Sequence, residues 1–140
     1  MKGLKTLIRL HKSEVDERRR RLTELQSMAE GLEEERRRFE EQVLEEQRVA
    51  SLSLETSLTY AAFARQVIDR REQYAAAKRE VERRIALAEA AVTEAFQELK
   101  RFELAEEDRV RREQARLKHA EALMLDEVAS QRFQRNQAEE

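Results

Sequence analysis

Residues 4–50 read LKTLIRLHKSEVDERRRRLTELQSMAEGLEEERRRFEEQVLEEQRVA, with apolar side chains recurring in alternating steps of four and three. Ten of the fourteen positions in this pattern are apolar, and the pattern averages one position every 3.5 residues. A repeat of that period keeps one stripe of a helix facing a single partner, so it predicts a coiled coil. We call these positions the first seam: Leu4, Ile8, His11, Val15, Arg18, Leu22, Leu25, Ala29, Leu32, Arg36, Phe39, Val43, Glu46 and Ala50.

The first seam stops where hydroxyl side chains gather. Five Ser and Thr residues lie within positions 51–59, which read SLSLETSLT. Such side chains compete with the helix for backbone hydrogen bonds, and this favours a turn. Ser53 or Ser57 is then the expected cap of the next helix. Because no Gly lies in this stretch, one unbroken helix is the alternative.

A second seam begins after the hydroxyl residues and continues to residue 128. Two steps of four plus four interrupt its heptads, and such steps shift the pattern locally toward an 11-residue repeat that flattens the supercoil. The pattern therefore predicts a second, longer helix. Its positions are Phe63, Val67, Arg70, Tyr74, Ala77, Val81, Ile85, Ala88, Val92, Ala95, Leu99, Phe102, Glu106, Val110, Glu113, Leu117, Ala120, Met124 and Val128.

The two seams predict an all-α fold, with two long helices in an antiparallel coiled-coil hairpin and a C-terminal helix that is longer and overhangs. We expect one domain over residues 1–140, with helix 1 at about 3–50, a turn at about 51–57 and helix 2 at about 58–138. Folding back near residue 54 makes two residues face each other when their numbers add to about 108. Residues 105–138 then extend ~50 Å past the N-terminus, at 1.5 Å per residue.

The predicted overhang carries an apolar stripe that helix 1 has no residues left to cover. A contiguous exposed stripe of this kind usually marks a surface that binds a partner. The stripe consists of Val110, Leu117, Ala120, Met124, Leu125 and Val128.

The composition agrees with long helices and excludes several other classes of protein. The 140 residues include two Gly, no Pro and no Cys, and 41% of them are charged. So few turn residues cannot punctuate a sheet or a bundle of many short helices. The formal net charge is −2, which creates no global attraction to nucleic acid or to an anionic membrane. The start, MKGLKTLIRLHK, lacks an apolar signal-peptide core, and no stretch is apolar enough to span a membrane, so we expect a soluble, unexported protein.

Nothing in the sequence points to catalysis. The two histidines, His11 and His119, lie far apart in the predicted register, so we expect no metal site. No Gly-rich phosphate loop is present, and a two-helix rod has no enclosed pocket in which to shift a carboxylate pKa. We therefore expect no catalytic residues and no cofactor. The basic runs 18–21 and 36–38 are flanked by Asp and Glu, which indicates a salt-bridged surface more than a nucleic-acid site.

Large side chains gather at the predicted tip of the hairpin. Tyr60, Phe63 and Val67 lie just beyond the turn, and Phe39 and Val43 lie before it. One interpretation is that they pack the tip. The other is that some of them face outward and bind a partner.

Four segments resemble the FliJ family, the small coiled-coil component of the bacterial flagellar type III export apparatus. They are TLIRLHKSEVDERRRRL at 6–22, YAAFARQV at 60–67, FQELKRFE at 96–103 and LMLDEVASQRFQR at 123–135. Their order and spacing extend the resemblance over the whole chain.

The resemblance implies a hairpin similar to the coiled coil of the rotary ATP synthase gamma subunit. It implies a cytoplasmic protein, peripheral at the membrane-embedded export gate, with three kinds of partner: the hexameric export ATPase FliI, the gate protein FlhA and export chaperones. Nucleic acid and direct membrane insertion are not expected. The implied ATPase-facing residues are Val15, Asp16, Leu125, Asp126 and Glu127, beside the apolar stripe. The implied gate-facing residues are Phe63 and Val67 with Phe39 near them, and Tyr60 adjoins them.

Two other functions are open at this point. A homo-oligomeric structural rod would bury the C-terminal stripe in a self-interface, and the stalk of a non-flagellar type III secretion system would share the same features. A nucleic-acid accessory protein is a weaker alternative, and it would show binding that weakens steeply with salt.

Overall fold

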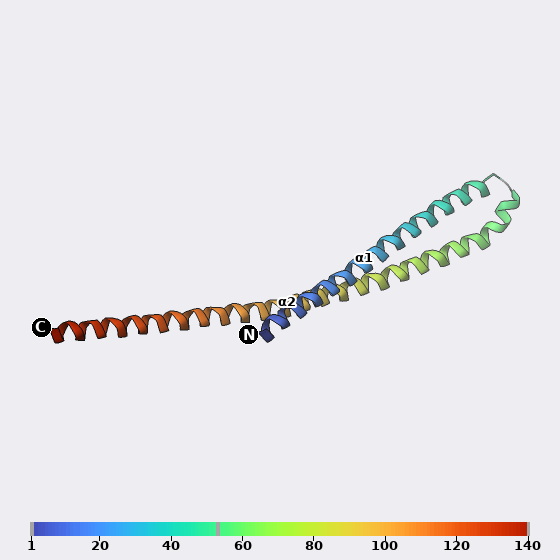
Figure 1. Ribbon diagram of the computed structural model, residues 1–140. Helices are drawn as coiled ribbons and strands as arrows, with labels where there is room; N and C mark the ends of the chain where they lie inside the picture. The colour runs from blue at the N-terminus through green and yellow to red at the C-terminus, as the bar shows by residue number, and fades with distance from the viewer. Residues whose placement is uncertain (1, 53, 140) are drawn as a thin grey trace. The chain divides into compact units, whose positions relative to one another are not determined.

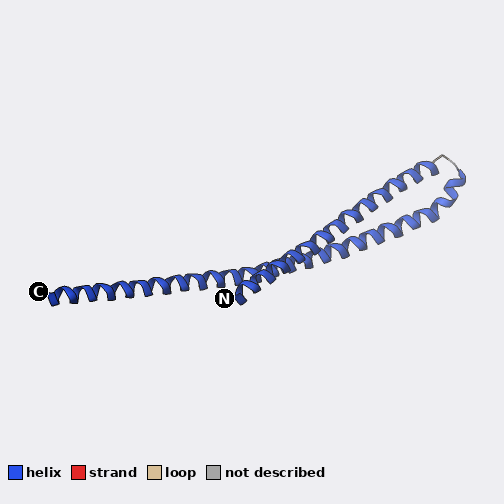
Figure 2. Ribbon diagram, in the orientation of Figure 1, coloured by secondary structure: helices blue, strands red, loops and turns tan. Residues whose placement is uncertain are grey.

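The computed structural model describes residues 2–52 and 54–139, with the side chains of 3–52 and 59–139. It contains two helices, α1 (Lys2–Ala50) and α2 (Leu54–Glu139), and the described part of the chain has no strand. Figure 2 shows helix along almost the whole of the described chain. The predicted all-α fold of two long helices is confirmed, and the single unbroken helix is excluded.

The helices are long because almost nothing in the sequence interrupts them. Pro is absent, and Gly31, in the interior of α1, keeps a helical backbone with no positive φ. Glu and Arg three or four positions apart add ion pairs along both helices, each worth only ~0.2–0.5 kcal/mol. Examples are Glu33 with Arg36 and Glu80 with Arg83.

The turn is shorter than the sequence predicts. The Ser51 amide donates to the Gln47 carbonyl at 3.2 Å, and the Leu52 amide donates to the Val49 carbonyl at 3.1 Å. α2 then begins at Leu54 and not near residue 58. Each Ser or Thr costs a helix only ~0.5–0.7 kcal/mol relative to Ala, too little to exclude residues 54–57. Ser53 lies outside the described residues, as does the Ser57 side chain, so neither predicted cap is described.

The chain packs as two compact units. The hairpin unit is Ser13–Phe96, and the terminal unit consists of Met1–Lys12 with Gln97–Glu140. The single domain predicted for residues 1–140 stays a prediction.

In the hairpin unit, α1 and α2 run in opposite directions side by side (Figure 1). Gln47 lies against Tyr60, and Phe39, further from the turn, lies against Tyr74. The core comes from seam positions, with Leu25 only 2% exposed. Burying such a side chain stabilises the fold by ~1.5–3 kcal/mol. The other buried residues of this unit are Val15, Val43, Val67, Val81 and Ala95.

The register agrees with the predicted one next to the turn, where the numbers of Gln47 and Tyr60 add to 107, and departs from it further along the hairpin. A sum of 108 places residue 69 opposite Phe39, whereas the ring of Phe39 meets Tyr74 at a centroid distance of 5.7 Å. Likewise Glu40 pairs with Arg71 and not with residue 68. The two numbers add to 111 for Glu40 with Arg71 and to 113 for Phe39 with Tyr74, so α2 does not keep one fixed register against α1 (Figure 1).

The terminal unit has a small core and a long exposed segment. The ring of His11 stacks on Phe102 at 4.6 Å, and Leu99 is buried. Glu106 and Arg109 are partly covered and form an ion pair at 2.9 Å. Every side chain from 110 to 139, which we call the C-terminal segment, is exposed. His11 therefore contributes to packing at its first-seam position.

Candidate partner-binding surfaces

The C-terminal segment displays large apolar side chains without covering them. Met124 is 73% exposed, Leu125 70% and Leu117 49%, and Val110 and Val128 are also exposed. At 100° per residue, Val110, Leu117, Met124 and Val128 fall on one face of α2. We call these four residues and Leu125 the C-terminal stripe. Exposed apolar stripes of this kind often mark surfaces that a partner covers, so the C-terminal stripe is a candidate binding surface.

Two large exposed apolar residues of this segment lie outside the predicted stripe. Leu123 is 56% exposed, and Phe133 is also exposed. Neither occupies a seam position, so the heptad pattern passed over them; their size alone was the available signal. Asp126 and Glu127, predicted as ATPase-facing, are exposed and directly follow Leu125 in the sequence.

The predicted pair Val15 and Asp16 is divided between core and surface. Val15 is 3% exposed and belongs to the core of the hairpin unit, so its side chain is not available to a partner in this conformation. Asp16 is exposed. The burial of Val15 follows from its first-seam position.

The structure brings the predicted tip residues together in a groove. Phe39, Phe63 and Val67 line one cavity with Gln66, Asp69, Arg70 and Gln73. Tyr60, Phe63 and Gln66 line an adjoining cavity with Glu46, Ala50, Thr59 and Ala62. Since both cavities share Phe63 and Gln66, we treat them as one surface and call it the tip groove.

The tip side chains combine packing with exposure. Val67 is 6% exposed, which favours the packing interpretation for that residue. Phe39, Tyr60 and Phe63 are half-buried, with the rings of Tyr60 and Phe63 5.9 Å apart. The Tyr60 hydroxyl accepts a hydrogen bond from the Gln47 side-chain amide at 3.1 Å. The groove thus has a fixed apolar floor and aromatic walls that water still reaches.

Arg70 is the tip residue that the sequence analysis did not single out. Its guanidinium carbon lies 5.2 Å from the centre of the Phe39 ring and 5.8 Å from that of Tyr74. One guanidinium N–H also donates to the Tyr74 hydroxyl at 3.3 Å. The available signal was a charged residue on the second seam, between Val67 and Tyr74.

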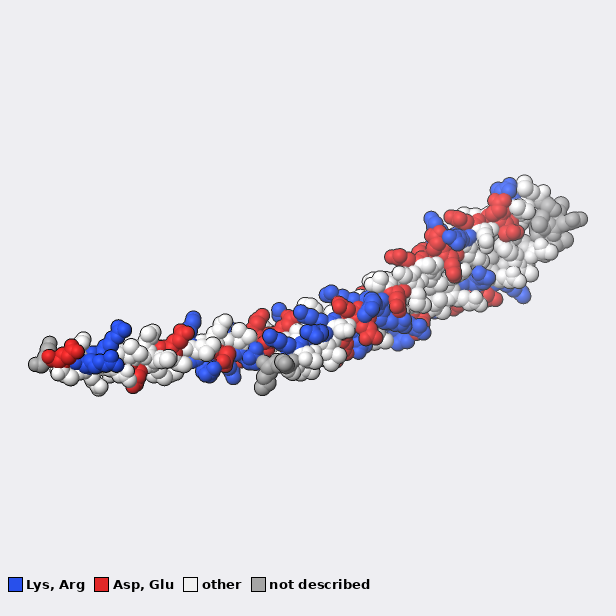
Figure 3. Space-filling model, viewed as in Figure 1, with Lys and Arg blue, Asp and Glu red and all other residues white. Residues whose placement is uncertain are grey.

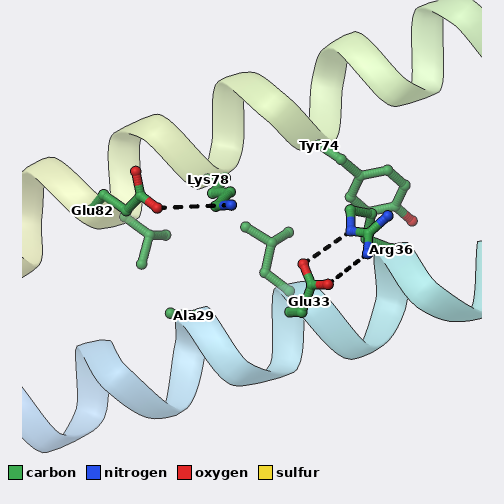
Figure 4. A pocket seen from close by; sticks show the side chains of 8 residues that line it. Ala29, Glu33, Arg36, Tyr74, Lys78 and Glu82 are labelled. Carbon is green, nitrogen blue, oxygen red and sulfur yellow. Dashed lines mark hydrogen bonds and ion pairs between the residues drawn. The ribbon is translucent and has the colours of Figure 1, made fainter.

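A second pocket lies between the helices further from the tip (Figure 4). Its floor is apolar, and its rim carries two ion pairs, Glu33 with Arg36 and Lys78 with Glu82. Because the charged groups already neutralise one another, the pocket offers no free acid, base or nucleophile for chemistry. Its lining is Ala29, Leu32, Glu33, Arg36, Tyr74, Lys78, Val81 and Glu82.

A comparison with models of protein families shows which family this chain belongs to. A family model described as "Flagellar FliJ protein" matches residues 1–138. The chain belongs to the FliJ family. No curated protein and no solved structure matches the chain.

Membership of the FliJ family makes this a protein of the flagellar export apparatus. The family consists of structural or adaptor proteins rather than enzymes. No helix in the described part of this FliJ-family chain is long and apolar enough to cross a membrane. Within the same residues, no group of three His, Cys, Asp or Glu side chains lies close enough to hold a metal ion.

The basic runs of this FliJ-family chain are largely neutralised by neighbouring acids. Lys and Arg lie beside Asp and Glu over much of the face in Figure 3. The hydrogen bond from Arg36 lowers the pKa of Glu33, and that from Arg37 lowers the pKa of Glu34. The pattern supports the salt-bridged interpretation over a nucleic-acid site. The pairs are Arg18 with Glu14, Arg21 with Glu24, Arg36 with Glu33, and both Arg37 and Arg38 with Glu34.

Proposed function

We propose that this chain is a non-enzymatic stalk and adaptor, cytoplasmic and peripheral at the export gate, that contacts the export ATPase FliI and the gate protein FlhA. The observation that carries the proposal is the exposed C-terminal stripe on a chain of the FliJ family. A helix face that displays this much apolar area gains stability only when a partner covers it.

The C-terminal stripe is the proposed ATPase contact. Leu117, Met124 and Val128 follow a helical repeat, so one face of α2 can insert into an apolar partner surface as a helix-in-groove contact. Asp126 and Glu127 add negative charge to the same part of α2, which would orient the complex and speed association with a basic rim. Asp16 is the one exposed candidate of the predicted α1 pair.

The tip groove is the proposed FlhA contact. Its half-buried aromatic residues Phe39, Tyr60 and Phe63 offer area that a partner can finish covering, and aromatic anchors of this type dominate many interfaces. Val67 supports them from the core. Export chaperones are proposed as further partners, on the support of the family relationship alone.

The ATPase contact is tested by two matched substitutions, Leu117→Ser and Leu123→Ser. Both leucines are about half exposed in the same segment, but only Leu117 lies in the stripe. Burial of a leucine is worth ~1.5–3 kcal/mol, so Leu117→Ser should weaken FliI binding ten- to a hundredfold. Leu123→Ser should leave it nearly unchanged. Equal effects in a binding titration would show that the stripe is not the contact.

A further inference from the structure

Two neighbouring arginines at the tip have different environments. The guanidinium of Arg71 makes two hydrogen bonds of 2.8 Å to the Glu40 carboxylate across the hairpin, and this pairing raises the pKa of Arg71. Arg70 has no carboxylate partner among the described residues, and its polar contact is the Tyr74 hydroxyl. Arg71 therefore links the two helices, whereas the charge of Arg70 is available to pair with a carboxylate of a partner.

The two aromatic rings hold Arg70 in place. Its guanidinium lies over Phe39 from α1 and Tyr74 from α2, within the distance at which a cation is attracted to a ring face. A guanidinium has five N–H donors, and the Tyr74 hydroxyl takes one of them. A planar group with free donors that is already ordered loses little entropy when it binds a carboxylate.

The residues around Arg70 define what would fit beside the charge. Phe39 and Phe63 supply apolar walls, and the amides of Gln66 and Gln73 supply hydrogen-bonding groups. Asp69 also lines the groove, so a partner with many negative charges would be repelled. The arrangement favours a single carboxylate next to a bulky apolar side chain.

We propose that the tip groove binds a partner segment in which one acidic side chain is flanked by apolar side chains, and that Arg70 reads the carboxylate. The proposal rests on the proposed function, in which the tip groove is the gate-facing surface, and it adds the chemistry of the segment recognised. The carboxylate accepts two N–H bonds from Arg70, while its neighbours pack on Phe39 and Phe63.

The direct test uses the full chain and a pair of short peptides. In one peptide a glutamate is flanked by phenylalanine and leucine, and in the other glutamine replaces the glutamate. We expect the glutamate peptide to shift the NMR signals of Gln66, Gln73 and the Arg70 side-chain N–H. It should bind about tenfold more tightly than the glutamine peptide, because hydrogen bonds to a charged group are stronger than those to a neutral amide. Equal binding of the two peptides, or shifts elsewhere only, would overturn the proposal.

Variants of adjacent residues sharpen the test. Arg70→Gln should abolish the preference for glutamate, and Arg70→Lys should retain part of it, because lysine keeps the charge without the planar fork. Asp69→Asn should strengthen binding of the glutamate peptide. Arg71→Gln is the matched control: it removes the same charge one position away and breaks the Glu40 pair, so it should lower stability without changing the preference. A preference that survives Arg70→Gln would assign recognition to another residue.

The same variants separate this inference from the proposed function. If purified FlhA binds the chain and Arg70→Gln weakens that binding about tenfold, both are supported. If FlhA binds the original chain and Arg70→Gln equally, the proposed carboxylate recognition is wrong, and the tip contact depends on its aromatic residues alone. If FlhA does not bind but the peptides are distinguished, the groove reads an acidic segment of some other protein, and the gate assignment fails.

Discussion

At the scale of single residues, Gly31 is a position where a substitution should make α1 more stable. It lies in the helix interior, and a Cβ added there would meet no atom within 4 Å. Glycine in a helix is less favourable than alanine by ~1 kcal/mol, because it loses more backbone freedom on folding. Gly31→Ala should therefore raise the free energy of unfolding by about 0.5–1 kcal/mol in urea titrations.

Gly3 provides the control for this substitution. A Cβ added at Gly3 would also meet open space, but this residue lies in the first turn of α1, where the helix frays and backbone order is smaller. Gly3→Ala should give a clearly smaller gain. A loss of stability from Gly31→Ala would mean that a partner or a second copy packs against that helix face.

Glu80 gives the chain a pH dependence at the same scale. Its carboxylate accepts hydrogen bonds from Arg83 at 2.8 Å and from Arg84 at 3.0 Å, and these lower its pKa from 4.5 to about 2. A carboxyl with a depressed pKa stabilises the fold fully above its unfolded pKa. That contribution should fall as the pH drops from about 4.5 to 2.

The measurement compares the original chain with Glu80→Gln. The difference in unfolding free energy should be constant between pH 5 and 7 and should shrink toward zero near pH 2. High salt should reduce it throughout, because the ion pair is largely exposed. A difference that grows on acidification would contradict the hydrogen-bonded arrangement.

At the scale of the helices, the hairpin unit predicts which exposed positions approach each other. Glu41 and Glu72 lie on α1 and α2 in the same stretch as the bonded pair Glu40 and Arg71. The chain has no cysteine, so cysteines introduced at these two positions take spin labels cleanly. Helices that pack side by side have axes about 10 Å apart. A separation near 46 Å, which one straight helix requires at 1.5 Å per residue, would contradict the hairpin.

The helices themselves could be predicted because their signal is local and repeated. Leu25, Val43 and Val81 occupy seam positions and are buried, and loss of the seam after Ala50 marked the turn. The start of α2 could not be placed, because Ser and Thr weaken a helix too little to determine where it begins. The facing register changes along the hairpin, from a sum of 107 at Gln47 and Tyr60 to 113 at Phe39 and Tyr74, and a heptad pattern read on each helix alone carries no information about that change.

The same difference, between what one helix encodes and what depends on two helices, decides which candidate sites could be predicted. Exposure of Leu117 and Met124 followed from counting residues, because α1 is too short to cover them in any nearby register. The stacking of Arg70 on Phe39 and Tyr74 did not, because it requires Tyr74 to lie opposite Phe39 where the predicted register placed residue 69. Sites built on one helix are thus easier to predict than sites built across two.

At the scale of the whole molecule, the C-terminal stripe distinguishes an adaptor from a self-assembling rod. An adaptor leaves the stripe uncovered until its partner arrives, and a rod buries it against another copy. We expect light scattering at micromolar concentration to give the monomer mass of 16.6 kDa. A stable dimer that Leu117→Ser dissociates would instead support the rod.

The strongest test of the adaptor removes the stripe altogether. Truncation after Arg109 deletes residues 110–140, whose described side chains are all exposed, so the free energy of unfolding of the remaining chain should change little. Helical content should fall only by the share of residues removed. If the truncated chain unfolds, the segment is part of a core that its exposure does not reveal.

The same truncation should abolish the proposed binding to FliI, because the apolar area that a partner would bury is gone. Replacing Asp126 and Glu127 by lysine in the full chain should weaken binding to FliI in a salt-dependent way, since exposed charges act mainly on orientation and association rate. The two variants differ in what salt can restore: high salt should narrow the gap between the lysine variant and the original chain, but it should not rescue the truncation. Full-strength binding of FliI by the truncated chain would show that the stripe serves a different partner, and the ATPase contact would then have to lie on α1 or at the tip.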